Sequence, residues 1–198
     1  MTTAAAPTVK ALPARHYTRT AIALHWAIAV LIIANLAVGY ICGNFEFAFE
    51  DVLMNLHKVT GILVFALSHL RLAWRFAHRP PPLDFVSAWQ RRAAGLVQGL
   101  LYGLMIALPL TGWIVTSSFP KRHPISLGFV DVPFLPVTAS LPRAMLAHSA
   151  HEVLAIIMTV LVAGHVAAAL HHQFVLRDNL ITRVLPRRRP ENHAPSVQ

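Results

Sequence analysis

Four histidines are the first candidates for chemistry in this sequence, because each lies inside a long apolar stretch where a polar ring is costly without a partner. His151 and His165 are 14 residues apart in the last of these stretches. In a helix this spacing returns to within about 40° of the same face and separates the two residues by about 21 Å along the axis. His25 and His57 lie in the first two stretches. Neutral imidazole is the commonest metal ligand in proteins, so these positions are candidates for metal binding.

Four apolar segments must position these histidines. The segments lie at about residues 21–41, 52–76, 95–116 and 145–174. Each reaches the length of about 20 residues that a helix needs to cross a bilayer. Short connections between consecutive helices make them antiparallel neighbours. The sequence therefore predicts an all-α membrane protein, an antiparallel four-helix transmembrane bundle that forms a single domain of residues 1–198.

The composition supports this fold class. Of the 198 residues, 56% are hydrophobic and 13% are charged, whereas a soluble domain has about 45–50% apolar and about 25% charged residues. These values exclude a soluble enzyme, a disordered protein and a nucleic-acid-binding domain, although the net charge is +9. The bilayer is therefore a predicted partner, and nucleic acid is not.

The basic residues indicate the orientation, because cytoplasmic segments of membrane proteins carry the excess of Lys and Arg. The segments on one side of the four spans carry Lys10, Arg15, Arg19, Arg75, Arg79, Arg91, Arg92, Arg177, Arg183, Arg187, Arg188 and Arg189. The opposite side carries only Lys121, Arg122 and Arg143, and its first loop is acidic. Both termini are therefore predicted to face the cytoplasm.

The depth of each histidine in its span sorts the four into two levels. His25 and His165 lie near the cytoplasmic surface, and His57 and His151 lie near the outer surface. Two imidazoles at each level supply both axial ligands of a haem iron, so the pattern predicts two haems in series across the bilayer. The single cysteine, Cys42, excludes the paired cysteines that attach haem covalently.

Other histidines compete less well for these roles. His148 is near the outer level but is rotated by roughly 100° from the face that carries His165. His69 is turned by about 120° from His57 and is interpreted as a packing or interfacial residue. A set of four histidines that only pack between helices is the simplest alternative to haem binding.

Two further residues share faces with the candidate ligands. Arg71 follows His57 by 14 residues, at the cytoplasmic haem level, where a guanidinium can pair with a haem propionate or a quinone carbonyl. His172 follows His165 by seven residues and is about 10 Å nearer the cytoplasm, where it can hydrogen-bond a quinone and deliver a proton. The alternatives are a snorkelling arginine and an interfacial histidine without a special role.

Two features concern the packing around the bundle. Gly95, Gly99 and Gly103 are spaced as G-x-x-x-G-x-x-x-G on the third segment, which predicts the close approach of another helix or, alternatively, room for a porphyrin plane. The connection of residues 117–144 contains five prolines and is the largest predicted feature outside the membrane. It is expected to cap the outer face of the bundle.

A series of short motifs, in order along nearly the whole chain, carries a family resemblance. They are Leu24-His25-Trp26, Leu56-His57-Lys58-Val59-Thr60-Gly61, Ile106-Ala107-Leu108-Pro109-Leu110-Thr111-Gly112, His151-Glu152, Gly164-His165-Val166-Ala167-Ala168 and Arg177-Asp178-Asn179. In these motifs the chain resembles the prokaryotic cytochrome b561 family of four-helix dihaem membrane proteins. The resemblance implies that His25, His57, His151 and His165 are the axial ligands of two non-covalent b-type haems. It also implies a multi-pass protein of the bacterial inner membrane, with quinone contacts at the cytoplasmic end, where His172 lies.

The resemblance to superoxide oxidase members of this family implies an oxidoreductase that takes electrons from periplasmic superoxide and reduces ubiquinone. Positive charge at the outer entrance helps such an enzyme to attract the anion. Here Lys58, Lys121 and Arg122 are the candidate residues for this attraction, but nearby acidic residues offset them.

Two other functions remain open. One is an electron-transfer subunit that accepts electrons from a periplasmic dehydrogenase, hydrogenase or soluble cytochrome docked on residues 117–144. The other is a haem-free carrier or scaffold whose histidines bind metal ions or relay protons. A partner that co-purifies with the chain would favour the first, and a colourless purified protein would favour the second.

Overall fold

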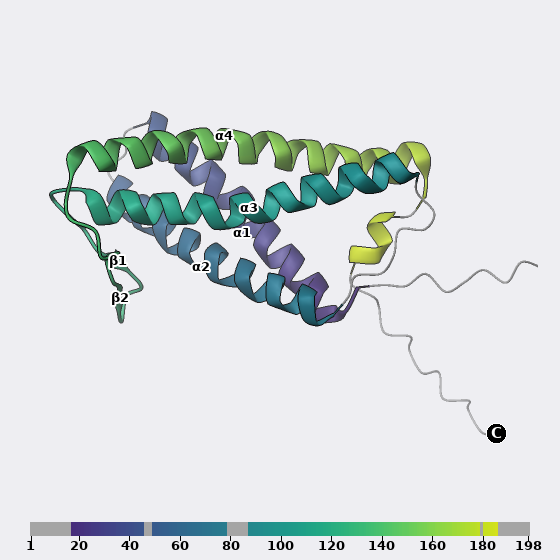
Figure 1. Cartoon of the computed structure of the whole chain (residues 1–198), viewed down its shortest axis with the longest axis horizontal. Helices are drawn as coiled ribbons and strands as arrows, with labels where there is room; N and C mark the ends of the chain where they lie inside the picture. Colours follow the sequence, from purple (N-terminus) through teal and green to yellow (C-terminus); the bar gives the residue numbers. More distant parts are fainter. Residues whose placement is uncertain (1–16, 46–48, 79–86, 179, 186–198) are drawn as a thin grey trace, which may run out of the picture.

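Four long α-helices form most of the protein in the computed structural model, which describes residues 17–45, 49–78, 87–178 and 180–185. The helices are α1 (Arg19–Asn44), α2 (Glu50–Ala77), α3 (Ala88–Ser118) and α4 (Leu141–His171). Successive helices run in opposite directions along the bundle (Figure 1). All four are long and apolar enough to cross a membrane. The predicted all-α, antiparallel four-helix transmembrane bundle is confirmed.

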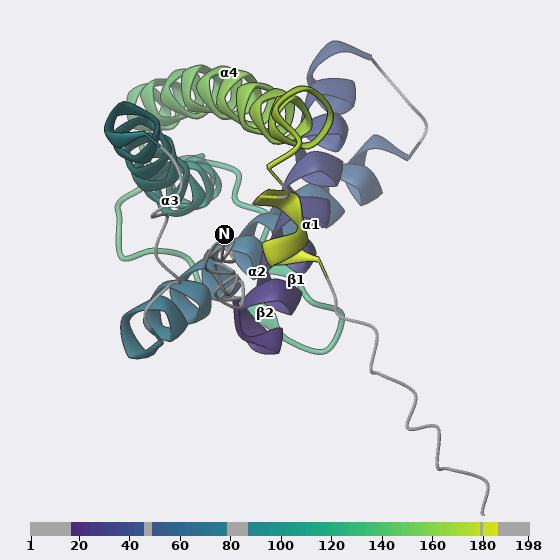
Figure 2. The ribbon, with the colours of Figure 1, turned by 90° about the vertical axis from the view of Figure 1, so that its right-hand side faces the viewer.

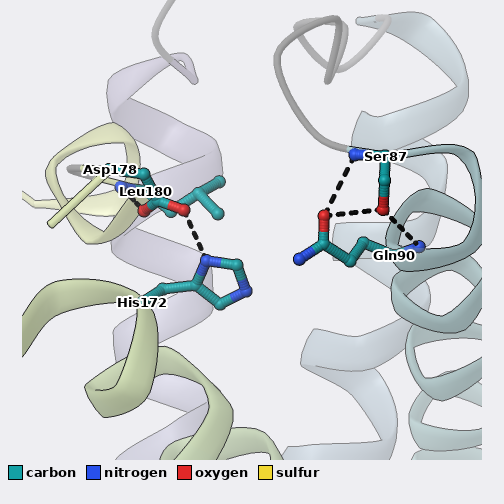
Figure 3. Close-up of polar contacts among 5 residues, drawn as sticks. All are labelled: Ser87, Gln90, His172, Asp178 and Leu180. Carbon is teal, nitrogen blue, oxygen red and sulfur yellow. Dashed lines mark hydrogen bonds and ion pairs between the residues drawn. The ribbon is translucent and has the colours of Figure 1, made fainter. Parts of the chain in front are cut away.

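The helices extend beyond the predicted apolar spans because polar residues cap their ends. The third span was expected to begin at residue 95, but α3 begins at Ala88. The side chain of Ser87 accepts a hydrogen bond from the backbone of Gln90, whose side chain accepts one from the backbone of Ser87 (Figure 3). This capping box satisfies two backbone groups at the helix start. At α4, Ser140 caps the backbone nitrogen of Arg143, so that helix also begins before its apolar stretch.

The helices pack as two pairs, α1 with α2 and α3 with α4, which α2 and α3 join (Figure 2). In the described part of the chain, α4 makes no comparable contact with α1 or α2. The core lies in the middle of the bundle and contains Ile28, Ile32, Val64, Leu104, Met105 and Met158. Met158 is midway along α4 between His151 and His165, so an apolar layer separates the two histidine levels.

The outer faces of the helices are apolar and uncovered. On α4, for example, Val153, Ile156 and Val160 are each more than half exposed. Apolar faces of this extent are stable only against another apolar surface, and lipid tails supply one along the length of a spanning helix. The protein is therefore a multi-pass membrane protein.

The three glycines Gly95, Gly99 and Gly103 lie on the exposed face of α3. A Cβ atom added at any of them would meet no atom within 4 Å. The close helix approach predicted at this ridge is therefore wrong within the described chain, whereas room for a porphyrin plane stays a prediction. Other glycines, Gly39 and Gly112, make the close contacts instead, and both contact histidine rings.

The connection between α3 and α4 contains a short hairpin, in which β1 (Ile125–Ser126) pairs antiparallel with β2 (Asp131–Val132). The side chain of Asn55 on α2 donates to the carbonyl of Ser126 at 3.0 Å and accepts from its backbone nitrogen at 3.1 Å. The hairpin therefore lies against the side of the bundle near the start of α2 (Figure 1). The sequence had instead predicted that this connection caps the outer face of the bundle.

After α4 the chain continues in a π-helical turn, η1 (His172–Leu176), and then reverses. The reversal occurs at Arg177, whose φ of 53° is in the left-handed region that often ends helices. A short 3₁₀ helix, η2 (Leu180–Val184), follows. The indole nitrogen of Trp26 on α1 donates to the carbonyl of Val184 at 2.8 Å, which fastens the C-terminal segment to the bundle.

Candidate functional site

The four candidate histidines meet in two facing pairs, each made by side chains from two different helices. The ring centroids of His57 on α2 and His151 on α4 are 6.1 Å apart, and the ring planes meet at 79°. Those of His25 on α1 and His165 on α4 are 6.5 Å apart, at 77°. His57 and His151 form the outer pair, and His25 and His165 form the inner pair. The structure thus brings together the same residues that the depth argument groups.

The separation of the rings suits one metal ion between them. Two metal–imidazole bonds of about 2.0 Å each, together with the half-widths of the two rings, place the centroids roughly 6 Å apart. Among the described residues, no group of three or more His, Cys, Asp or Glu side chains could hold a metal ion. Each pair therefore supplies two ligands only, which fits a haem iron whose other four ligands belong to the porphyrin.

His57 is held by α1. Its Nδ1 lies 3.1 Å from the carbonyl oxygen of Asn35, and since a carbonyl only accepts, Nδ1 carries the hydrogen and donates it. One turn later on α1, Gly39 leaves room for the ring, because a Cβ atom there would lie 2.8 Å from Cε1 of His57. The remaining nitrogen, Nε2, keeps its lone pair for a metal. A backbone partner of this kind commonly orients metal-binding histidines.

His151 is held by α3 in the same way. Its Nδ1 lies 3.0 Å from the carbonyl oxygen of Leu108, to which the hydroxyl of Thr111 also donates at 2.8 Å. A Cβ atom at Gly112 would lie 3.1 Å from Cε1 of the ring. In both cases the carbonyl and the glycine are four residues apart, so each ring occupies the space beside one helical turn. Both rings of the outer pair therefore have Nε2 as the metal-binding nitrogen.

The inner pair has a different arrangement, because Arg71 contacts His25. The guanidinium nitrogen Nη1 lies 3.1 Å from Nδ1 of His25, and the guanidinium carbon lies 5.6 Å from the centre of the Tyr102 ring. Arginine only donates, so Nδ1 accepts here and the neutral ring of His25 carries its hydrogen on Nε2. Metal binding through Nε2 therefore requires Arg71 to leave this nitrogen.

His172 forms a contact with Asp178 that the sequence did not suggest. Its Nδ1 donates to Oδ2 of Asp178 at 2.5 Å, and Oδ1 of Asp178 accepts from the backbone nitrogen of Leu180 at 3.2 Å (Figure 3). Asp178 thus joins the end of α4 to the start of η2. The contact leaves Nε2 of His172 as the nitrogen available to a ligand.

The competing histidines lie outside both pairs. His148 is 3.6 Å from Glu152 on the surface of α4, and both side chains are more than half exposed. Nδ1 of His69 lies 2.8 Å from the carbonyl of Phe65 on its own helix, to which it donates. Arg122, one of the candidate steering residues, lies over the ring of Phe134.

Apolar spanning helices around paired histidines define the class of membrane electron-transfer cytochromes. The profile of the prokaryotic cytochrome b561 family matches residues 16–187. In Escherichia coli (strain K12), cytochrome b561 homolog 1 is 32% identical over 180 residues, which cover 87% of this chain and 98% of that protein. Homolog 2 of the same organism is 33% identical over 172 residues, covering 82% and 87%. The chain belongs to the prokaryotic cytochrome b561 family, whose members bind b-type haem.

One relative carries a name that describes an activity. A protein of Yersinia pestis named probable superoxide oxidase CybB is 25% identical over 178 residues, which cover 88% of this chain and 98% of that protein. Its similarity extends over the same helices that carry the histidine pairs.

Proposed function

We propose that this cytochrome holds two non-covalent b-type haems, one between His57 and His151 and one between His25 and His165, and moves electrons between them across the bilayer. The observation that carries the proposal is the pair of facing histidines at each of two levels. The levels are separated by about 21 Å along α4, which places one near each membrane surface.

When bound, haem supplies an iron that exchanges one electron between its ferric and ferrous states. The chain's own residues hold the ligands still while this happens. The carbonyls of Asn35 and Leu108 fix the two rings of the outer pair, so these rings need no rearrangement in either redox state. At the inner pair, Arg71 would have to leave His25, and its guanidinium could then pair with a haem propionate.

Ubiquinone is the proposed electron acceptor, bound at the inner end of the bundle near His172. What supports this position is the contact of His172 with Asp178, which fixes the ring and leaves Nε2 for a quinone oxygen. A positioned histidine can hydrogen-bond that oxygen and pass a proton during its reduction. The quinone takes up two electrons and two protons and becomes the quinol.

Superoxide is the proposed electron donor, oxidised at the outer pair. The likeness to the Yersinia pestis relative supports this choice. Two superoxide anions each lose one electron and leave as dioxygen, which supplies the two electrons of one quinone. Lys58 follows His57 directly and is partly buried, so it provides a positive charge next to the entry point.

The bilayer is proposed to be the bacterial inner membrane, with both termini in the cytoplasm. The distribution of Lys and Arg supports this orientation. In this orientation the inner pair and Asp178 are on the cytoplasmic side, which supplies the protons for the quinol. The hairpin is on the periplasmic side.

The test is the addition of superoxide to the purified protein in nanodiscs that contain ubiquinone, followed by visible spectroscopy. We expect superoxide to reduce the haems and ubiquinone to reoxidise them, with two superoxide anions consumed per quinol. Haems that quinol reduces but superoxide does not would contradict the proposed donor. That result would favour a periplasmic dehydrogenase, hydrogenase or soluble cytochrome as donor, and co-purification from the native membrane would then identify it.

A further inference from the structure

The β1–β2 hairpin exposes an apolar tip. The four residues between its strands are Leu127, Gly128, Phe129 and Val130, none of which is charged. Phe129 is 90% exposed and Val130 is 52% exposed. The backbone nitrogen of Leu127 donates to the carbonyl of Val130 at 2.9 Å, and Gly128 has a φ of 89°, which favours glycine. The tip is thus a formed turn that presents apolar side chains.

Two helices hold this hairpin at a fixed depth. On one strand, Asn55 of α2 makes two hydrogen bonds with the backbone of Ser126. After the other strand, the indole nitrogen of Trp113 on α3 donates to the carbonyl of Pro133 at 3.0 Å. Asn55 is five residues inside α2, about 8 Å from its start, and two residues before His57. The hairpin is therefore held near the level of the outer histidine pair.

The hairpin also lies beside the helices. Figure 1 shows it projecting to the side of the bundle away from α4, and Figure 2, along the bundle, shows the same separation from α4. Next to its attachment, Val52 and Leu56 on α2 are 70% and 52% exposed. The tip and these side chains are therefore both apolar and uncovered at this end of the bundle, and a spanning helix presents such a face to lipid.

We propose that Leu127, Phe129 and Val130 insert into the boundary between the headgroups and the acyl chains of the leaflet at this end of the bundle. Apolar and aromatic side chains are favourable at this boundary. A water-soluble partner protein fits this position less well, because the tip lies beside the helices near the level of His57, which is inside the apolar span. The hairpin then fixes the depth of the outer histidine pair in the leaflet, through Asn55 and Trp113.

The test uses the full chain in nanodiscs with Cys42→Ser, so that one new cysteine at a time can carry a nitroxide label. The three sites are Phe129→Cys at the tip, Val160→Cys on the exposed face of α4 as the lipid reference, and Lys121→Cys on the same connection as the water reference. Power saturation measures how often each label collides with oxygen, which prefers lipid, and with a nickel chelate, which prefers water.

We expect the ratio of oxygen to nickel collisions at Phe129→Cys to be several-fold higher than at Lys121→Cys and closer to that at Val160→Cys. A ratio equal to that at Lys121→Cys would overturn the proposal, because the tip would then lie in water, as a docking surface for a soluble partner would.

A second measurement keeps the test valid if labelling disturbs the fold. In Phe129→Trp, the added fluorescence should be quenched by lipids brominated high on their acyl chains and little by acrylamide. The unsubstituted protein, which has four tryptophans, provides the baseline. Added fluorescence that acrylamide quenches as fully as it quenches free tryptophan would contradict membrane insertion.

Discussion

His57 and Gly39 lie so close across the α1–α2 interface that a Cβ atom at position 39 would come within 2.8 Å of the histidine ring. Real Cβ atoms essentially never lie this close to another heavy atom. The neighbouring atom is a ring carbon of His57, whose Nδ1 donates to the carbonyl of Asn35. A shift of the ring away from Gly39 would strain this hydrogen bond. Gly39 is therefore part of the histidine site, although it carries no side chain.

Replacing Gly39 with alanine should remove the haem of the outer pair. Alanine is the better helix former by about 1 kcal/mol, so any loss must come from the clash and not from the helix itself. The pyridine haemochrome assay should then give about one haem per chain. Gly43→Ala is the matched control, since a Cβ atom one turn further along α1 meets nothing within 4 Å. Equal haem content in the two variants would contradict the prediction.

Gly112→Ala should have a smaller effect on the same haem. The contact with His151 would be 3.1 Å, which a shift of a few tenths of an ångström relieves. We expect the outer haem to be retained but released more readily on titration with a competing apoprotein. Gly103→Ala on the same helix should leave the release unchanged, because its surroundings are open. If Gly112→Ala holds both haems as tightly as the unsubstituted protein, the close contact between Gly112 and the His151 ring does not contribute to haem binding.

Arg71→Ala should weaken the binding of the haem at the inner pair and lower the reduction potential of that haem. The ferric haem carries one more positive charge than the ferrous haem. Removing a positive charge beside the iron therefore favours the ferric state, so reduction becomes harder. Arg75→Ala is the control, since Arg75 also lies near the Tyr102 ring, at 6.0 Å, but has no contact with His25 among those the structure describes. A redox titration that follows both haems measures the change. An unchanged potential for the inner haem would show that Arg71 acts only on the apoprotein.

Asp178→Asn should slow quinol formation while both haems remain bound. Asparagine keeps the shape of the side chain but removes the charge that faces His172. We expect a loss of about tenfold in the rate, at the lower end of what positioned acid–base groups contribute, together with a changed pH profile. Asp131→Asn on the hairpin should not alter the rate. A haem loss in Asp178→Asn without a change in its rate per haem would indicate a purely structural role.

The sequence predicts the helices and the grouping of the histidines well, because both follow from the distance along an apolar helix. The depths of His25, His57, His151 and His165 depend only on the 1.5 Å rise per residue, which packing does not alter. The ends of the helices are harder to predict, since the polar residues that cap α3 and α4 lie outside the apolar pattern.

The contacts made across helices are not visible in the sequence. The repeated spacing of Gly95, Gly99 and Gly103 indicated a close approach, yet these residues face outward. Gly39 and Gly112 belong to no such repeat. Their role depends on the rings of His57 and His151, which lie on other helices and contact them only in the folded protein. Asp178 belongs to one of the family motifs, but its contact with His172 was not predicted, because the left-handed Arg177 breaks the helical periodicity between the two residues.

The assignment of the four histidines can be tested directly by counting haems in two double variants. His25→Ala with His165→Ala removes both ligands of the inner pair, and His25→Ala with His57→Ala removes one ligand from each pair. We expect the first protein to keep one haem per chain and the second to keep none, as measured by pyridine haemochrome on monodisperse protein. One haem retained in the second variant, or none in the first, would contradict the pairing of His25 with His165 and of His57 with His151.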